Sequence, residues 1–114
     1  MKIRQIAELL DAELLCGERE FDDEVLSACG SDMMSDVLAY VKDQALLLTG
    51  LINPQVIRTA MMMDMRCIVF VRNKRPSSEM IALATENHIV MLSTKSRMYE
   101  ACGLLYKNGL GSSE

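Results

Sequence analysis

The sequence contains one histidine, no tryptophan and few aromatic residues of any kind. One histidine is too few for a metal site built on histidines. His88 has no aspartate or serine near it in the sequence that would form a catalytic dyad. The phosphate-binding loops G-x-x-x-x-G-K and G-x-G-x-x-G are both absent. These absences argue against an enzyme, and we expect a protein without catalytic residues or a cofactor.

Long hydrophobic runs are also missing. No apolar stretch approaches the roughly 20 residues that a helix needs to cross a bilayer. The N-terminus begins with charge at Lys2 and Arg4, and no apolar segment with a small-residue cleavage site follows. We therefore expect a cytoplasmic protein that contacts no membrane.

Cysteine is present but forms no C-x-x-C pair. The four cysteines each sit within an apolar stretch: Cys16, Cys29, Cys67 and Cys102. A metal or iron–sulfur site is one interpretation, but the spacing favours reduced, buried thiols that behave as small hydrophobic side chains. Disulfides are not expected in a cytoplasmic chain, and we predict no metal site.

Basic residues do not dominate the composition. Twelve Lys and Arg face sixteen Asp and Glu, for a net charge of -4, which argues against nucleic acid as a partner. The 114 residues are 50% hydrophobic and 25% charged, an ordinary mixture for one globular domain that can bury a core without disulfides.

A repeat of about 22 residues runs through the second half of the chain. Its three blocks cover residues 44–65, 66–87 and 88–109, and each begins with a continuous apolar run, at 45–48, 67–71 and 89–92. Continuous runs of this length are typical of strands buried on both faces. A polar turn and a segment with helical spacing follow each run. Alternating strands and helices predict a parallel sheet with right-handed crossovers.

The turns of the repeat begin two of these helices. Asn53-Pro54 is a strong helix start, and Pro76 occupies the matching place in the second block. Before the repeat, we predict a helix near 3–10, strands at 14–16 and 25–29, and a helix at 33–41. The whole chain is then one α/β domain over residues 1–110, followed by a flexible tail at 111–114.

Ligands of parallel α/β sheets usually bind beyond the carboxyl ends of the strands. The residues predicted there are rich in hydroxyls, amides and positive charge: Ser31, Asp32, Thr49, Gly50, Asn53, Arg72, Asn73, Ser93, Thr94 and Lys95. Together with helix N-termini they suit a small anion such as a phosphate or carboxylate. Polar turns that only cap helices are the competing interpretation.

Methionine is the most unusual part of the composition, with ten residues. The run Met61-Met62-Met63-Asp64-Met65 places Met61 and Met65 on one helix face, whereas Met62 and Met63 point elsewhere. Met62 and Met63 either form an adaptable surface for a partner or second subunit, or pack between the sheet and a neighbouring helix.

Three segments resemble the DRTGG-domain family. They are residues 31–39 (SDMMSDVLA), the Asn53-Pro54 helix start after a strand, and residues 90–95 (VMLSTK) followed by a helix containing Tyr99-Glu100. The resemblance runs from Met1 to about Leu110, although the DRTGG string itself is absent. It implies a fold similar to the N-terminal domains of HPr kinase and the Mur ligases. It also implies a non-catalytic regulatory module of the kind found beside CBS pairs and phosphotransacetylases.

Two functions therefore stay open. The first is a regulatory domain that senses a small anionic ligand, such as a nucleotide, at the carboxyl ends of the strands. The second is a protein-interaction module without a small ligand. It would form a homodimer or dock on a redox enzyme, because the resemblance includes stand-alone proteins of anaerobes encoded beside iron-only hydrogenases.

Overall fold

The computed structural model describes residues 1–40 and 44–112. Helices and strands alternate over most of this length. In chain order they are α1 (Ile3–Leu10), β1 (Glu13–Cys16), a 3₁₀ turn (Glu18–Glu20), β2 (Ser27–Gly30), α2 (Met34–Tyr40), β3 (Ala45–Thr49), α3 (Pro54–Met62), β4 (Cys67–Phe70), α4 (Ser78–Glu86), β5 (Val90–Ser93), α5 (Met98–Lys107) and β6 (Gly111–Ser112). The predicted α/β domain is confirmed, and strand boundaries within the repeat differ by one residue at most.

The strands form one six-stranded sheet in the order β1-β5-β4-β3-β2-β6. All neighbours are parallel except β1, which pairs antiparallel with β5. The parallel sheet predicted from the repeat is confirmed for β3, β4 and β5, whereas β1, which lies before the repeat, runs in the opposite direction. Parallel strands that follow one another in the chain need a long crossover, usually a helix. Only the 3₁₀ turn lies between β1 and β2, so β1 runs opposite to β2 and to the strands parallel with it.

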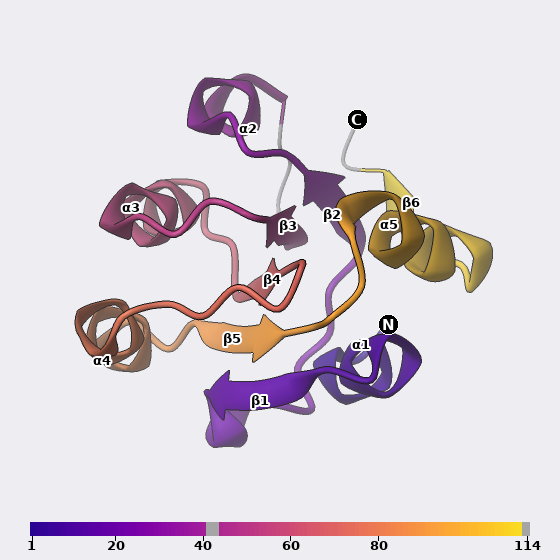
Figure 1. Cartoon of the computed structure of the whole chain (residues 1–114), viewed down its shortest axis with the longest axis horizontal. Helices are drawn as coiled ribbons and strands as arrows, with labels where there is room; N and C mark the ends of the chain where they lie inside the picture. The colour runs from indigo at the N-terminus through magenta and orange to yellow at the C-terminus, as the bar shows by residue number, and fades with distance from the viewer. Residues whose placement is uncertain (41–43, 113–114) are drawn as a thin grey trace.

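Helices cover both faces of the sheet (Figure 1). On one face lie α2, α3 and α4, and on the other lie α1 and α5. The change of face after β5 follows from handedness. The chain moves along the sheet from β2 to β5 and then returns to β6, so a right-handed crossover on the return passes over the opposite face.

The apolar runs of the repeat form the buried centre. Every residue of β3, β4 and β5 is buried. Alternate side chains enter two core clusters, so that Leu47 and Ile68 pack under α2, α3 and α4, whereas Leu46 and Val69 pack under α1 and α5. This burial on both faces explains the continuous, non-alternating pattern of the strands.

The helices α3 and α4 begin in different ways, although a proline precedes or opens each of them. Asn53 caps α3 by accepting from Gln55 N at 2.8 Å, with Pro54 at the first helical position, as predicted. Pro76 does not match Pro54, because Ser77 caps α4 and the helix begins after it.

The C-terminal tail also departs from expectation. The sequence predicts a flexible tail at residues 111–114. Gly111–Ser112 instead pair with the outer edge of β2, and residues 113–114 lie outside the described residues. Leu110 is buried under α5 and brings the chain to this edge, where backbone pairing adds a short sixth strand. The predicted strand at 25–29 likewise begins later, at Ser27, and the end of the predicted helix at 33–41 lies outside the described residues. No helix in the described residues is long and apolar enough to span a bilayer.

Candidate functional site

The carboxyl ends of β2, β3, β4 and β5 lie side by side, as the repeat predicts. Backbone bonds join the first residue after a strand to the end of the neighbouring strand: Ser31 N donates to Leu48 O at 3.0 Å, Val71 N to Thr49 O at 3.0 Å, and Thr94 N to Phe70 O at 2.9 Å. We call the loops that follow these strands the carboxyl edge. They bring together most of the polar residues predicted to bind a ligand.

Asp32 lies in the loop after β2 and reaches the loop after β3. Its Oδ1 accepts a hydrogen bond from the Gly50 backbone N–H at 2.6 Å and another from Thr49 Oγ1 at 3.0 Å. Thr49 is fully buried, and its Oγ1 also accepts from Leu51 N at 3.1 Å. A backbone N–H and a hydroxyl that hold a carboxylate oxygen are also the kind of donors that hold a phosphate oxygen.

Arg72 lies directly over Gly50. A Cβ atom on residue 50 would come within 2.5 Å of Arg72 Nη2, so glycine leaves room for the guanidinium. Arg72 is exposed and forms no ion pair with any residue that the structure describes. A free cation therefore stands beside donors that already hold an anion.

The turn that carries Arg72 has an unusual backbone. Arg72 and Asn73 both have positive φ, 58° and 56°, and Lys74 N donates back to Val71 O at 3.2 Å. These are the features of a type I′ turn, which residues with a side chain adopt at some cost. Two bonds to the loop after β5 hold it: Arg72 N donates to Ser96 O and Asn73 N to Thr94 O, each at 2.8 Å.

Ser93 and Thr94 support this turn with their hydroxyls. Ser93 Oγ donates to Lys74 O at 2.9 Å, and Thr94 Oγ1 donates to Leu10 O at 2.8 Å. Both residues are almost fully buried. The structure therefore gives the two hydroxyls a positioning role inside the protein.

The remaining predicted residues divide into caps and exposed groups. Ser31 Oγ accepts from Met33 N at 3.0 Å, and Asn53 caps α3. Asn73 is exposed in the turn after β4, and Lys95 is exposed in the loop after β5. The edge thus combines one held carboxylate with exposed cations at Arg72 and Lys95.

A model of the DRTGG domain matches residues 5–107. The chain belongs to the DRTGG domain family. A search of curated proteins found no match for this DRTGG domain.

A solved structure shares the fold. It contains the CBS and DRTGG domains of the regulatory region of Clostridium perfringens pyrophosphatase, complexed with its activator diadenosine tetraphosphate. The TM-score is 0.72 and the sequence identity is 16%. The match covers 91% of this DRTGG domain but only 45% of that chain, so it spans less than half of the regulatory region.

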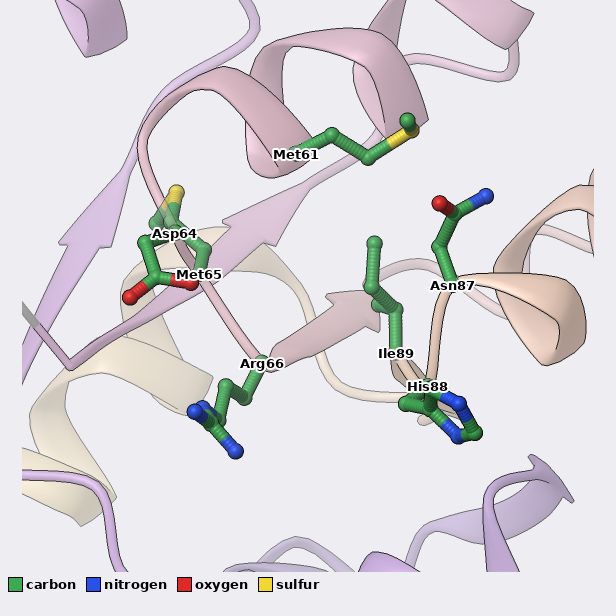
Figure 2. A pocket seen from close by; sticks show the side chains of 7 residues that line it. All are labelled: Met61, Asp64, Met65, Arg66, Asn87, His88 and Ile89. Carbon is green, nitrogen blue, oxygen red and sulfur yellow. The ribbon is translucent and has the colours of Figure 1, made fainter.

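The opposite edge of the DRTGG domain carries a hollow that sequence reasoning missed. It measures about 350 Å³ at the amino ends of β4 and β5, and Figure 2 labels its lining: Met61, Asp64, Met65, Arg66, Asn87, His88 and Ile89. The polar side chains do not converge, since Arg66 and Asn87 point in different directions (Figure 2). Asn87 Nδ2 donates to Leu83 O of its own helix at 2.8 Å.

The hollow arises where α3 and α4 end. Asp64 and His88 follow these helices with positive φ, 53° and 59°, the conformation in which a helix commonly stops. The repeat could have indicated this place, because Asp64 and His88 each follow the helical segment of a repeat block.

Neither thiols nor methionines add chemistry to the site. All four cysteines are free, and burial raises the pKa of each thiol, which disfavours the reactive thiolate. No group of three or more His, Cys, Asp or Glu within the described ranges could hold a metal ion. Met62 is 73% exposed, whereas Met63 is half-buried and packs against the core under α2, α3 and α4.

Proposed function

We propose that this DRTGG domain is a non-enzymatic regulatory domain that binds a small phosphate-containing ligand, such as a nucleotide, at the carboxyl edge. The Asp32 carboxylate carries the proposal, because the Gly50 N–H and the Thr49 hydroxyl hold it as they would hold a phosphate oxygen. The related regulatory region of a pyrophosphatase, which was solved with a nucleotide activator, supports the ligand class.

The ligand takes the place of the Asp32 carboxylate in this proposal. A phosphate oxygen accepts from Gly50 N and Thr49 Oγ1, while the guanidinium of Arg72 supplies a charged hydrogen bond from above Gly50. Lys95 adds positive charge from the neighbouring loop. Displacement of Asp32 frees the start of α2, which gives the domain a way to report binding.

Isothermal titration calorimetry with ATP, pyrophosphate and diadenosine tetraphosphate tests the site. We expect at least one of these to bind, and Arg72→Ala to weaken it about 10- to 150-fold, as for loss of a charged hydrogen bond. Arg66→Ala is the matched control, because it removes an equal charge from the opposite edge. Asp32→Asn should tighten binding several-fold, because it removes a competing negative charge.

Two results would overturn this function. One is the absence of binding by all three probes. The other is an equal loss of affinity in Arg72→Ala and Arg66→Ala, which would indicate attraction to overall charge without a site. A thermal shift offers a second readout, since a ligand at 100 times its Kd adds about 2.7 kcal/mol of stability.

A protein-interaction module is the second candidate, and the exposure of Met62 favours it. Flexible methionine side chains suit surfaces that adapt to a partner. The partner class implied by the sequence resemblance is a redox enzyme such as an iron-only hydrogenase. Titration of the purified hydrogenase with the wild-type domain and with Met62→Gln tests this candidate, which predicts binding by the wild type and weaker binding by the variant.

A further inference from the structure

The outer face of α5 has a composition that the core does not explain. Its exposed residues recur at helical spacing: Tyr99, Glu100, Gly103, Tyr106 and Lys107. The tyrosine side chains are 87% and 72% exposed. Ala101 and Leu105 point the other way and are buried beside α1. Two large aromatic side chains therefore lie in solvent on one helix face.

Gly103 lies at the centre of this face. A Cβ atom added there would meet nothing within 4 Å, so intramolecular packing does not require glycine. Glycine inside a helix costs about 1 kcal/mol relative to alanine. What glycine permits at an exposed helix position is the close approach of a second backbone.

The residues around Gly103 are arranged on two sides. With about 100° per residue, Tyr99 and Tyr106 fall on one side of Gly103, and Glu100 and Lys107 fall on the other. Tyr99 and Glu100 lie one turn before Gly103, and Tyr106 and Lys107 lie one turn after it. The face is therefore aromatic along one side and carries opposite charges along the other.

We propose that this face binds the same face of a second copy, with the two α5 helices antiparallel and crossing at Gly103. A twofold axis perpendicular to both helices brings Tyr99 of each copy onto Tyr106 of the other. The same axis brings Glu100 of each copy onto Lys107 of the other. Every contact occurs twice, as an isologous interface requires, and both charge contacts are attractive.

A hollow beside the helix adds to the complementarity. It measures about 190 Å³, adjoins Tyr106 on the aromatic side, and has mainly apolar lining: Ala28, Gly30, Leu48, Cys102, Leu105, Tyr106, Leu110 and Gly111. Tyr99 of the second copy lies next to Tyr106 and can place its ring at this hollow. An aromatic anchor in an apolar pocket is the arrangement that contributes most to binding at protein interfaces.

The contact is about one helix wide, so we expect a weak, concentration-dependent dimer. Sedimentation equilibrium over a range of protein concentrations measures it. The wild type should dimerise, whereas Glu100→Lys and Lys107→Glu alone should each weaken dimerisation at least tenfold, because like charges then meet twice. An equimolar mixture of the two variants should restore the dimer, since both contacts between unlike copies are again opposite charges.

Separate controls test whether the variants fold and whether the interface lies on α5. Glu100 also accepts from Arg97 N at 3.3 Å, so circular dichroism must show that Glu100→Lys retains α5. Gly103→Leu should fold normally and still weaken the dimer at least tenfold, because its side chain holds the helices apart. Met62→Gln, on the other face of the sheet, should leave the dimer unchanged.

Three outcomes would overturn the proposal. They are a monomeric wild type at all concentrations, a variant mixture that does not recover the dimer, and a dimer that Met62→Gln abolishes. None of them bears on ligand binding at the carboxyl edge, because that site and the α5 face have no residue in common.

Discussion

At the carboxyl edge of the sheet, side-chain hydrogen bonds between distant segments add to the backbone bonds that hold the loops, whereas at the amino edge local backbone turns end the helices. Asp32, Ser93 and Thr94 each reach to another loop or helix at the first edge. At the second edge, Asp64 and His88 end their helices with positive φ, and local backbone bonds such as Met65 N to Ala60 O at 2.8 Å complete each turn.

The two edges therefore differ in how firmly their loops and exposed side chains are held. The carboxyl edge keeps a strained turn and an exposed cation, Arg72, in place because buried hydroxyls secure the loops around it. The amino edge forms a hollow of about 350 Å³, but its polar side chains do not converge (Figure 2).

The largest effect that we expect comes from Gly17→Ala at the amino edge. Gly17 has φ of 97°, and a Cβ there would lie 2.8 Å from Val90 Cα at the start of β5. Strain and a backbone clash together should reduce the free energy of unfolding by about 3 kcal/mol. Urea denaturation measures the loss. Gly111→Ala is the control, because a Cβ there meets nothing within 4 Å.

Thr94→Val should be next in size and acts on the carboxyl edge. It leaves the Leu10 carbonyl and Ser96 N without their partner, at 2.8 Å and 3.3 Å in the native protein. Loss of a buried hydrogen bond costs about 1–3 kcal/mol. Thr85→Val removes an exposed bond within α4 and should change thermal stability little. Equal stability losses in the two variants would contradict the supporting role of Thr94.

Substitution of Asp64 or His88 by glycine should stabilise the protein. Both residues occupy a helix end that glycine favours, as Gly109 does after α5 with φ of 102°. We expect Asp64→Gly and His88→Gly each to raise the free energy of unfolding by about 0.5–1 kcal/mol, and alanine at either position to lower it. Chemical denaturation distinguishes these signs. Destabilisation by glycine would show that the side chains hold this edge.

The smallest effect concerns pH at the carboxyl edge. Arg75 binds Glu13 of β1 through two contacts of 2.9 Å and 3.0 Å, and its charged hydrogen bond lowers the pKa of the Glu13 carboxyl. Stability from a lowered pKa is present above the unfolded pKa, about 4.3, and is lost as pH falls through the folded value. Urea titrations of the wild type and Glu13→Gln should therefore converge only below about pH 4.

The meeting of the loops at the carboxyl edge could be predicted from sequence because it depends on a repeat. Three apolar runs of similar length imply neighbouring parallel strands, and neighbouring parallel strands place Thr49, Arg72 and Ser93 at one edge. The pattern could not show which hydrogen-bond partner each polar side chain has. The bond from Thr94 to Leu10 joins residues 84 positions apart, and Asp32 reaches Gly50 from the loop after β2.

The sequence alone determined the α/β class, the buried strands and the edge where polar residues gather, because hydrophobic spacing and turn residues act over short distances. Only the tertiary structure decided the direction of β1, the face that α5 covers and the pairing of Gly111–Ser112 with β2. These depend on which sheet edges remain open once the central strands have paired. That is a property of the assembled sheet, and no local segment contains it.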